Sequence, residues 1–175
     1  VAHALLKARA IAGWLQERGE PGRTLVLADD SGLCVDALGG LPGVDSAYFA
    51  GPEGDDAANN RRLVAELTAR GLSSSPAHYV CVLALRRVDG ARLPDLPGSS
   101  EVDEVRLLEA RGHGEVRTAA RGTGGFGYDP HFWPEGSERS AAELSAVEKD
   151  AASHRGQATA RLLAALPAVL ADGGR

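Results

Sequence analysis

The amino-acid sequence predicts an α/β protein in which helices flank a mixed β-sheet. Segments with helical spacing of apolar side chains alternate with apolar runs typical of buried strands, and no internal repeat is evident. The length of 175 residues suits one domain, which at this size buries about 70% of the surface of the unfolded chain. We therefore expect a single domain over residues 1–175.

The first predicted helix covers residues 4–18, and Gly19 is a plausible stop. The chain contains no methionine and opens directly in this helical pattern, so we expect an N-terminally incomplete domain. The apolar side chains expected to line one face of this helix are Leu5, Leu6, Ile11, Trp14 and Leu15.

A short apolar strand is predicted over residues 24–28, and it stops at two adjacent aspartates. We expect Asp29-Asp30-Ser31-Gly32 to form a loop after it, followed by a short apolar stretch at residues 33–35. Asp55 and Asp56 provide an acidic start for a helix that runs to about Ala69. Its inward side chains are expected to be Leu63, Val64 and Leu67.

The second half of the chain is predicted to continue the sheet. Residues 73–76 are rich in serine and predict a loop, whereas residues 79–85 form a continuous apolar run typical of a strand buried on both faces. Residues 89–104 are polar and rich in glycine and proline, which predicts a loop. Residues 105–117 predict a hairpin that turns near Gly112-His113-Gly114.

Two capping boxes precede the C-terminal segment, because a serine is followed three residues later by a glutamate at 140–143 and again at 145–148. The last helix is predicted from about Ser153 to Ala171, before Gly173-Gly174.

Composition and charge restrict the classes of function. A formal net charge of −5 removes the general electrostatic case for a nucleic-acid partner. No apolar stretch of roughly 20 residues could span a membrane, and no secretory segment is evident. Cys34 and Cys81 are too few for a disulfide framework and lie among apolar neighbours, so we expect core residues in a cytoplasmic protein. The only lysines are Lys7 and Lys149.

Asp29 and Asp30 form the first candidate site. Ligands of open α/β sheets gather beyond the carboxyl ends of strands, and two adjacent carboxylates repel each other unless a cation neutralises them. Mg²⁺ prefers such oxygen ligands and often joins them to phosphates. An acidic turn, in which an aspartate caps the residues that follow, is the alternative that the residues themselves leave open.

The glycine-rich segment from Gly122 to Gly127 is the second candidate. It formally matches the dinucleotide-binding pattern GxGxxG, but Pro130 follows too closely for the helix that this pattern must open, so we reject that interpretation. The loop can approach a ligand closely, and Phe126 or Tyr128 could stack on a base. A tight turn with a core aromatic is equally compatible.

Three cations near the start of the last helix form the third candidate. Lys149, His154 and Arg155 lie where free backbone N–H groups already favour anions or carbonyl oxygens. A solvated helix start is the alternative for any one of them. Three other histidines have no partners at metal-ligand spacing, and we expect them at the surface or in loops: His78, His113 and His131. A carboxylate site, a loop for a flat ring and a cationic helix start together suit a nucleoside triphosphate.

Five ordered blocks covering nearly the whole chain resemble the inosine triphosphate pyrophosphatase family. They are ALLKARA (4–10), LADDSGLCVDALGGLPGVDSA (27–47), DDAANNRRLVAEL (55–67), GTGGFGYDPHFWPEG (122–136) and AAELSAVEKDAASHRGQA (141–158). The resemblance implies an ITPase-like fold, an elongated mixed sheet flanked by helices with a cleft between two lobes. It also implies Mg²⁺-dependent hydrolysis of inosine, deoxyinosine or xanthosine triphosphate to the monophosphate and pyrophosphate, by a homodimer.

The resemblance also carries residue roles. Asp30 matches the metal-binding aspartate that acts as general base, and Ser31 matches a substrate contact. The nucleotide-binding segment FGYD is matched by Phe126, Gly127, Tyr128 and Asp129. The residues around the purine, whose donors to the 6-keto oxygen would reject adenine, are matched by Lys149, His154 and Arg155.

The sequence departs from the family pattern near Val1. The family's first strand and its segment Thr/Ser-x-Asn-x-x-Lys are expected upstream, and the positions of an acidic metal ligand and an asparagine hold Ala2 and His3. Residues 89–104 are longer than the usual family loop. Two other hypotheses therefore stand beside an active pyrophosphatase: a nucleotide-binding protein with impaired catalysis, and an enzyme that acts on canonical nucleotides.

Overall fold

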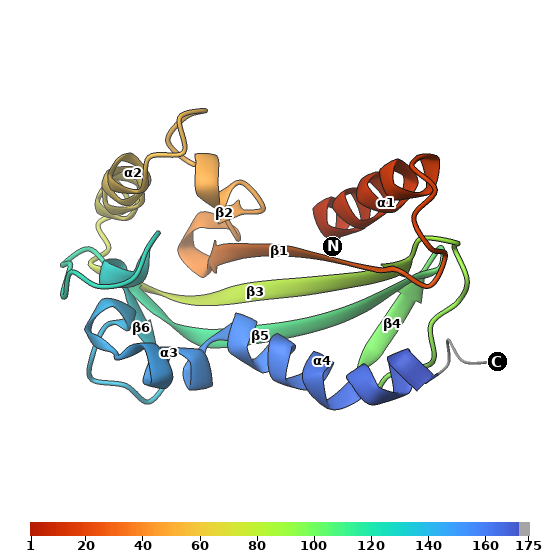
Figure 1. The fold of residues 1–175 in the computed structure, drawn as a ribbon. Helices are drawn as coiled ribbons and strands as arrows, with labels where there is room; N and C mark the ends of the chain where they lie inside the picture. The colour runs from red at the N-terminus through yellow and green to blue at the C-terminus, as the bar shows by residue number, and fades with distance from the viewer. Residues whose placement is uncertain (172–175) are drawn as a thin grey trace. The chain divides into compact units, whose positions relative to one another are not determined.

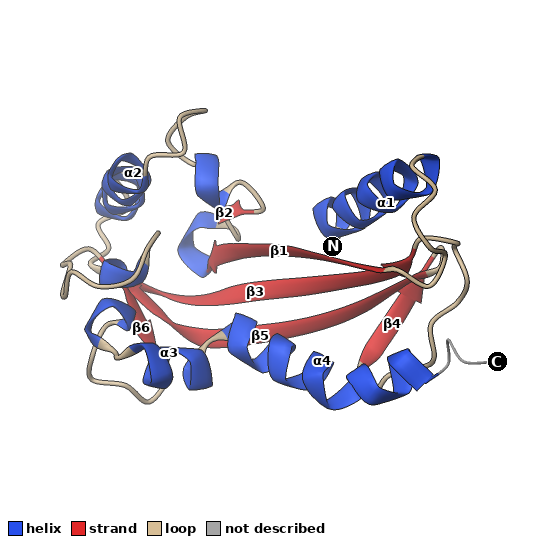
Figure 2. Ribbon diagram, viewed as in Figure 1, coloured by secondary structure: helices blue, strands red, loops and turns tan. Residues whose placement is uncertain are grey.

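The computed structural model describes residues 1–171 and confirms the α/β class. A six-stranded sheet has the order β2-β1-β3-β5-β4, and β6 pairs with β5 (Figures 1 and 2). The strands are β1 (Leu25–Val35), β2 (Pro42–Gly43), β3 (Ser74–Arg87), β4 (Ser99–Val102), β5 (Val105–Arg117) and β6 (Phe132–Pro134). The helices are α1 (Ala2–Glu17), α2 (Asp56–Thr68), α3 (Ala146–Ala152) and α4 (His154–Ala171).

Strand β1 runs through both aspartates to Val35, so the predicted strand end at residue 28 and the loop at 29–32 are wrong. Asp30 does not stop the strand because the ammonium of Lys7, on α1, compensates its negative charge. Gly32 permits β2 to approach: a Cβ at this position would lie 2.0 Å from the carbonyl oxygen of Gly43. The two carboxylates therefore lie within a strand.

Helix α1 confirms the predicted element but turns a different face inward. Its buried side chains are Ala4, Ala8 and Ala12, each at most 1% exposed, whereas Leu6 is 62% and Trp14 52% exposed. Alanines four residues apart share one side of a helix, and their small side chains let the helix approach its neighbours closely. The predicted apolar face is wrong because close approach favours small side chains over the larger ones.

Helix α2 and the centre of β3 confirm their predictions. The Asp55 side chain accepts hydrogen bonds from the first backbone N–H groups of α2, and Leu63 and Leu67 are fully buried. Residues 81–85 of β3 are buried on both faces, as the continuous apolar run predicts. The strand begins earlier than expected, however, because Ser74–Pro76 belong to it rather than to a loop.

Strands β4 and β5 form a hairpin where a loop was expected. Val102 pairs with Val105, and the two residues between them, Asp103 and Glu104, have φ angles of 47° and 65°. Two consecutive positive φ values are typical of the tight turns that match strand twist. The turn lacks the usual Asn-Gly signal, which explains why the sequence did not predict it.

Strand β5 is continuous to Arg117, so the predicted turn at residues 112–114 is wrong. Gly114 pairs with Pro134 of β6. A Cβ at Gly114 would lie 2.2 Å from the carbonyl oxygen of Trp133, which shows that this glycine admits a neighbouring backbone rather than a turn.

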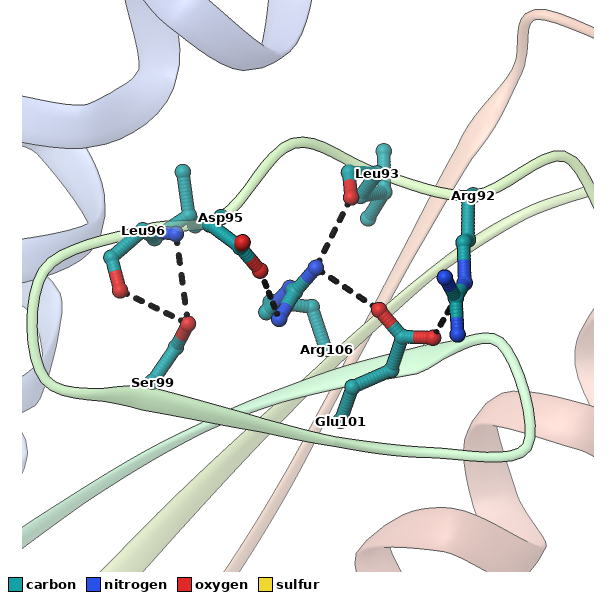
Figure 3. Close-up of polar contacts among 7 residues, drawn as sticks. All are labelled: Arg92, Leu93, Asp95, Leu96, Ser99, Glu101 and Arg106. Carbon is teal, nitrogen blue, oxygen red and sulfur yellow. Dashed lines mark hydrogen bonds and ion pairs between the residues drawn. The ribbon is translucent and has the colours of Figure 1, made fainter.

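A buried arginine anchors the segment before β4 (Figure 3). The guanidinium of Arg106 pairs with Asp95 at 2.9 Å and Glu101 at 2.7 Å, and it donates to the carbonyl oxygen of Leu93 at 2.9 Å. The second carboxylate oxygen of Glu101 pairs with Arg92 at 2.7 Å. Only 5% of Arg106 is exposed, and the segment is therefore held by charge-assisted hydrogen bonds despite its polar sequence.

The chain divides into two compact units, each with its own core. The first comprises residues 1–30, 81–110 and 157–171, and α4 contributes Ala158, Leu162 and Val169 to its core. In Figure 1, α1 and α4 lie on opposite sides of the strands of this unit. The second unit comprises residues 31–80 and 111–156.

Helix α4 extends to Ala171, the last described residue, and the predicted stop at Gly173-Gly174 lies outside the described residues. Within residues 1–171, no helix combines the length and the apolar character needed to cross a membrane.

Candidate functional site

Asp30 lies in the first unit beside a lysine. Its Oδ1 atom is 3.1 Å from Nζ of Lys7 and 4.0 Å from Nδ1 of His3, and Lys7 also donates to the backbone oxygen of Asp29 at 2.9 Å. The Asp30 side chain is 12% exposed. The charge of this carboxylate is thus compensated by a cation one helical turn beyond His3.

Asp30 is the predicted metal ligand, and its Oδ1 atom is paired with the ammonium of Lys7. No group of three histidine, cysteine or acidic side chains able to hold a metal occurs within residues 1–171. Mg²⁺ characteristically uses one or two carboxylates and takes its remaining ligands from phosphates and water. Asp30 can supply that carboxylate oxygen.

The glycine-rich loop lies in the second unit and is shaped around Asp129. Oδ2 of Asp129 accepts a hydrogen bond from the backbone N–H of Phe126 at 2.8 Å. A Cβ on Gly125, whose φ is 76°, would lie 2.0 Å from the same oxygen. The loop leads into a 3-10 helix at Asp129–His131 rather than the long helix of a dinucleotide-binding motif, which confirms the rejection of that interpretation.

The two aromatic residues of the loop have different environments. Phe126 is 64% exposed, so its ring can be covered by a ligand. Tyr128 is buried, and its hydroxyl donates to the carbonyl oxygen of Ser46 at 2.8 Å. Burial raises the pKa of Tyr128 well above its ordinary value. Phe126 is therefore the stacking candidate, and Tyr128 anchors the loop.

Lys149 joins the loop to α3. Its ammonium pairs with Asp129, which is 4% exposed, and lies 4.2 Å from the centre of the Phe126 ring. A cation over an aromatic face is attracted by the ring's negative π-surface. Both predicted capping boxes are present, and the one from Ser145 to Glu148 begins α3. The sequence thus brings Lys149 to Phe126 by starting a helix four residues earlier.

The junction between α3 and α4 positions the other two cations. Ser153 ends α3, and its hydroxyl accepts a hydrogen bond from the backbone N–H of Gly156 at 2.9 Å. A Cβ on Gly156 would lie 1.8 Å from the carbonyl oxygen of Asp150, so the two helices can meet this closely only at a glycine. His154 and Arg155 consequently occupy the first turn of α4.

Arg155 and His154 contact different parts of the second unit. Nη2 of Arg155 is 3.4 Å from Oγ of Ser31, the residue that follows Asp30. The imidazole of His154 stacks on the ring of Tyr79, with centroids 4.8 Å apart and planes 5° apart. Tyr79 in turn packs against the core cluster that contains Tyr128. The predicted residues of the second unit thus form three groups of contacts: Phe126 with Asp129 and Lys149, His154 with Tyr79, and Arg155 with Ser31.

Two side chains of α2, which the sequence analysis did not single out, hold the glycine-rich loop. Asp56 accepts a hydrogen bond from the backbone N–H of Gly127 at 2.7 Å, and Asn60 donates to the carbonyl oxygen of Gly127 at 2.9 Å. Residues four apart share one face of a helix, so this pair binds the backbone N–H and the backbone C=O of one residue, Gly127. The four-residue spacing of Asp56 and Asn60 is evident from the sequence, but their partner in the glycine-rich loop is not.

The remaining histidines correct one prediction. His131 is buried, and its Nδ1 atom lies 2.8 Å from the carbonyl oxygen of Arg117. His113 lies within β5, and its ring centroid is 5.6 Å from that of His78 on β3. The expectation of surface or loop positions is therefore confirmed for His113, which is exposed on its strand, and wrong for the buried His131. Of the two cysteines, Cys81 is buried as expected and Cys34 is half-buried.

Residues 1–165 match the Ham1 family. Among curated proteins, the dITP/XTP pyrophosphatase of Streptomyces avermitilis is 44% identical over 161 residues, which cover 92% of this chain and 70% of that protein. The dITP/XTP pyrophosphatase of Chromobacterium violaceum is 51% identical over 143 residues, covering 82% of this chain and 66% of that protein. This chain therefore spans about two thirds of the length of these relatives.

Two solved structures share the fold. A HAM1 protein from Coxiella burnetii has a TM-score of 0.75 and 36% identity, with 94% of this chain and 74% of that chain covered. The nucleoside-triphosphatase, dITP/XTP pyrophosphatase, from Mycobacterium abscessus has a TM-score of 0.66 and 40% identity, with 93% of this chain and 73% of that chain covered.

Proposed function

The chain belongs to the Ham1 family, and we propose that it is a nucleoside triphosphate pyrophosphatase for non-canonical purine nucleotides. Its substrates would be the triphosphates of inosine, deoxyinosine and xanthosine, and its products the monophosphate and pyrophosphate. The observation that carries the proposal is the contact between the exposed ring of Phe126 and Lys149, together with the stacking of His154 on Tyr79. The names of the two curated relatives support the same reaction.

The second unit would recognise the base. The exposed ring of Phe126 offers a surface for stacking, and Lys149, His154 and Arg155 offer hydrogen-bond donors. A 6-keto oxygen can accept from these donors, whereas the amino group of adenine cannot. Each donor left unpaired on burial costs about 1–3 kcal/mol, which is the physical basis for rejecting adenosine triphosphate.

Asp30 would act at the phosphate end. Its carboxylate would orient the attacking water and accept its proton, and it would supply an oxygen ligand to Mg²⁺. When bound, Mg²⁺ offsets the negative charge that develops on the phosphate oxygens. Lys7, whose ammonium already lies 3.1 Å from Asp30, would contribute a second positive charge in a protein with a net charge of −5.

The proposal is tested by incubating the purified protein with inosine triphosphate and Mg²⁺. We expect inosine monophosphate and pyrophosphate in equal amounts, with much slower turnover of adenosine triphosphate. Orthophosphate as the only phosphate product would contradict the proposed bond cleavage. Tight binding of inosine nucleotides without any product would instead identify a nucleotide-binding protein without catalysis.

The organisation of the whole protein belongs to the same proposal. We propose that residues 1–175 act as one domain, with the family's first strand and Thr/Ser-x-Asn-x-x-Lys segment upstream, in a cytoplasmic homodimer. The family resemblance supports the upstream segment and the dimer, and the two cysteines among apolar neighbours support the cytoplasmic location. Sedimentation equilibrium of the purified protein tests the dimer, for which we expect twice the mass of one chain.

A further inference from the structure

Tyr79 is the residue through which the loop and the start of α4 are connected in the second unit. Its ring lies parallel to the His154 imidazole, 5° from coplanar, with the centroids 4.8 Å apart. The same ring packs against the core cluster that contains Tyr128 of the loop. One side chain thus lies between the core that holds the loop and the helix turn that carries His154 and Arg155.

The Tyr79 ring is itself fixed from a second direction. The ring of Phe132 meets it nearly edge-on, with the centroids 4.8 Å apart and the planes at 69°. Tyr79 extends from β3 and Phe132 from β6, so both rings are mounted on strands. Side chains on strands hold their geometry better than side chains on loops, and packed neighbours lock their rotamers.

We propose that Tyr79 is a positioning residue that sets base specificity by fixing the plane of the His154 imidazole. The inference rests on the proposed function, in which His154 donates to the 6-keto oxygen of the purine. A hydrogen bond weakens steeply when its donor is misaligned. A His154 ring held parallel to Tyr79 can direct its N–H groups only within one plane, whereas an unsupported ring could rotate.

The proposal assigns the role to the ring of Tyr79 and not to its hydroxyl. Tyr79→Phe keeps the ring and removes only the hydroxyl, whereas Tyr79→Leu removes the aromatic stack altogether. Comparison of the two substitutions therefore separates the effect of the stack from that of any other change at this position.

The kinetic readout is the ratio of kcat/KM for inosine triphosphate to kcat/KM for adenosine triphosphate. We expect Tyr79→Leu to reduce this ratio roughly tenfold, the effect of one misaligned hydrogen bond. Tyr79→Phe keeps the aromatic stack and should keep the ratio. Leu83→Ala is the control for a cavity in the same strand, because Leu83 is buried in the other core cluster, and it should leave the ratio unchanged.

The structural readout is the proton spectrum of the His154 ring, assigned by its loss in His154→Gln. Stacking on an aromatic face shifts ring protons upfield, and we expect this shift in the wild type and in Tyr79→Phe but not in Tyr79→Leu. An unchanged kinetic ratio in Tyr79→Leu, with the His154 signals displaced, would overturn the specificity role. Absence of any turnover in the wild type would overturn the proposed function and that role with it.

Discussion

The ammonium group of Lys7 lies 3.1 Å from Oδ1 of Asp30. The other lysine of the chain, Lys149, pairs with Asp129. In a protein whose basic residues are otherwise all arginine, both lysines contact an aspartate that the family resemblance assigns to the site. A lysine ammonium is a compact, flexible charge that can exchange one anionic partner for another more readily than a bidentate arginine can.

Asp30→Asn should abolish pyrophosphate release from inosine triphosphate. The amide cannot accept the proton of the attacking water, and loss of a general base typically costs about 10²–10⁴ in rate. Asp29→Asn is the matched control, because adjacent side chains of a strand point to opposite faces, and we expect a smaller loss. Equal losses in both variants would contradict the assignment of the base to Asp30.

Lys7→Met should raise KM for inosine triphosphate roughly tenfold through loss of one charged contact. Steady-state kinetics at saturating Mg²⁺ provide the measurement. Arg9→Met is the control, because Arg9 pairs with Asp103 rather than with Asp30, and its KM should match the wild type. A common rise in both variants would indicate a general charge effect instead of a contact made by Lys7.

Asp56→Ala should raise KM roughly tenfold, because the backbone N–H of Gly127 loses its acceptor and the loop loses one of its two anchors on α2. Asp56→Asn keeps an acceptor oxygen and should restore most of the affinity. Asp55→Ala removes the helix cap beside it and should cost about 1 kcal/mol of unfolding free energy with KM unchanged. If Asp55→Ala raised KM as much, stability rather than loop position would explain the effect.

Gly156→Ala should lower the free energy of unfolding by about 1–3 kcal/mol, the usual cost of overpacking, and reduce turnover. The added Cβ would meet the carbonyl oxygen of Asp150 at 1.8 Å and displace the turn that carries His154 and Arg155. Gly13→Ala is the opposite case. No atom lies within 4 Å of a Cβ at this position. Because glycine is unfavourable inside a helix, Gly13→Ala should raise the free energy of unfolding by about 0.5–1 kcal/mol. Urea unfolding compares the two variants.

Glu148 should titrate far below an ordinary glutamate. The hydrogen bond from Arg139, followed by those from Ser145, lowers its pKa from 4.5 to about 2. Because the pKa is lower in the folded protein, the stabilisation is fully present above pH 4.5 and is lost as pH falls toward 2. Carboxyl carbon NMR should give a midpoint near pH 2, and Arg139→Gln should raise that midpoint. An unshifted midpoint in the variant would contradict the role of Arg139.

The local signals of the sequence predicted those elements whose ends depend on adjacent residues. Asp55 caps α2 and Ser145 caps α3 because a side chain a few residues away satisfies the free N–H groups of the helix. The glycines of the sheet were misinterpreted for the opposite reason. Gly32 and Gly114 suggested a loop and a turn, but each admits a backbone from a distant part of the chain, and no local pattern encodes that approach.

The candidate site shows the same division between features set by adjacent residues and features set by distant segments. Sequence blocks predicted the candidate residues Asp30, Asp129, Lys149, His154 and Arg155, because these residue types and their spacing are evident from the sequence alone. They did not identify Tyr79, which resembles any other aromatic residue of a buried strand, or Asp56 and Asn60, which resemble an ordinary helix start. Their roles depend on partners tens of residues away.

The sequence by itself thus determined the α/β class, the capped helices and the residues that carry the family resemblance, because propensity, capping and motif spacing act over a few residues. Tertiary structure decided that β1 continues through Asp30, that the ammonium of Lys7 compensates the charge of Asp30, and that Tyr79 stacks on His154. Those outcomes depend on packing and charge compensation between distant segments, which become defined only when the chain has folded.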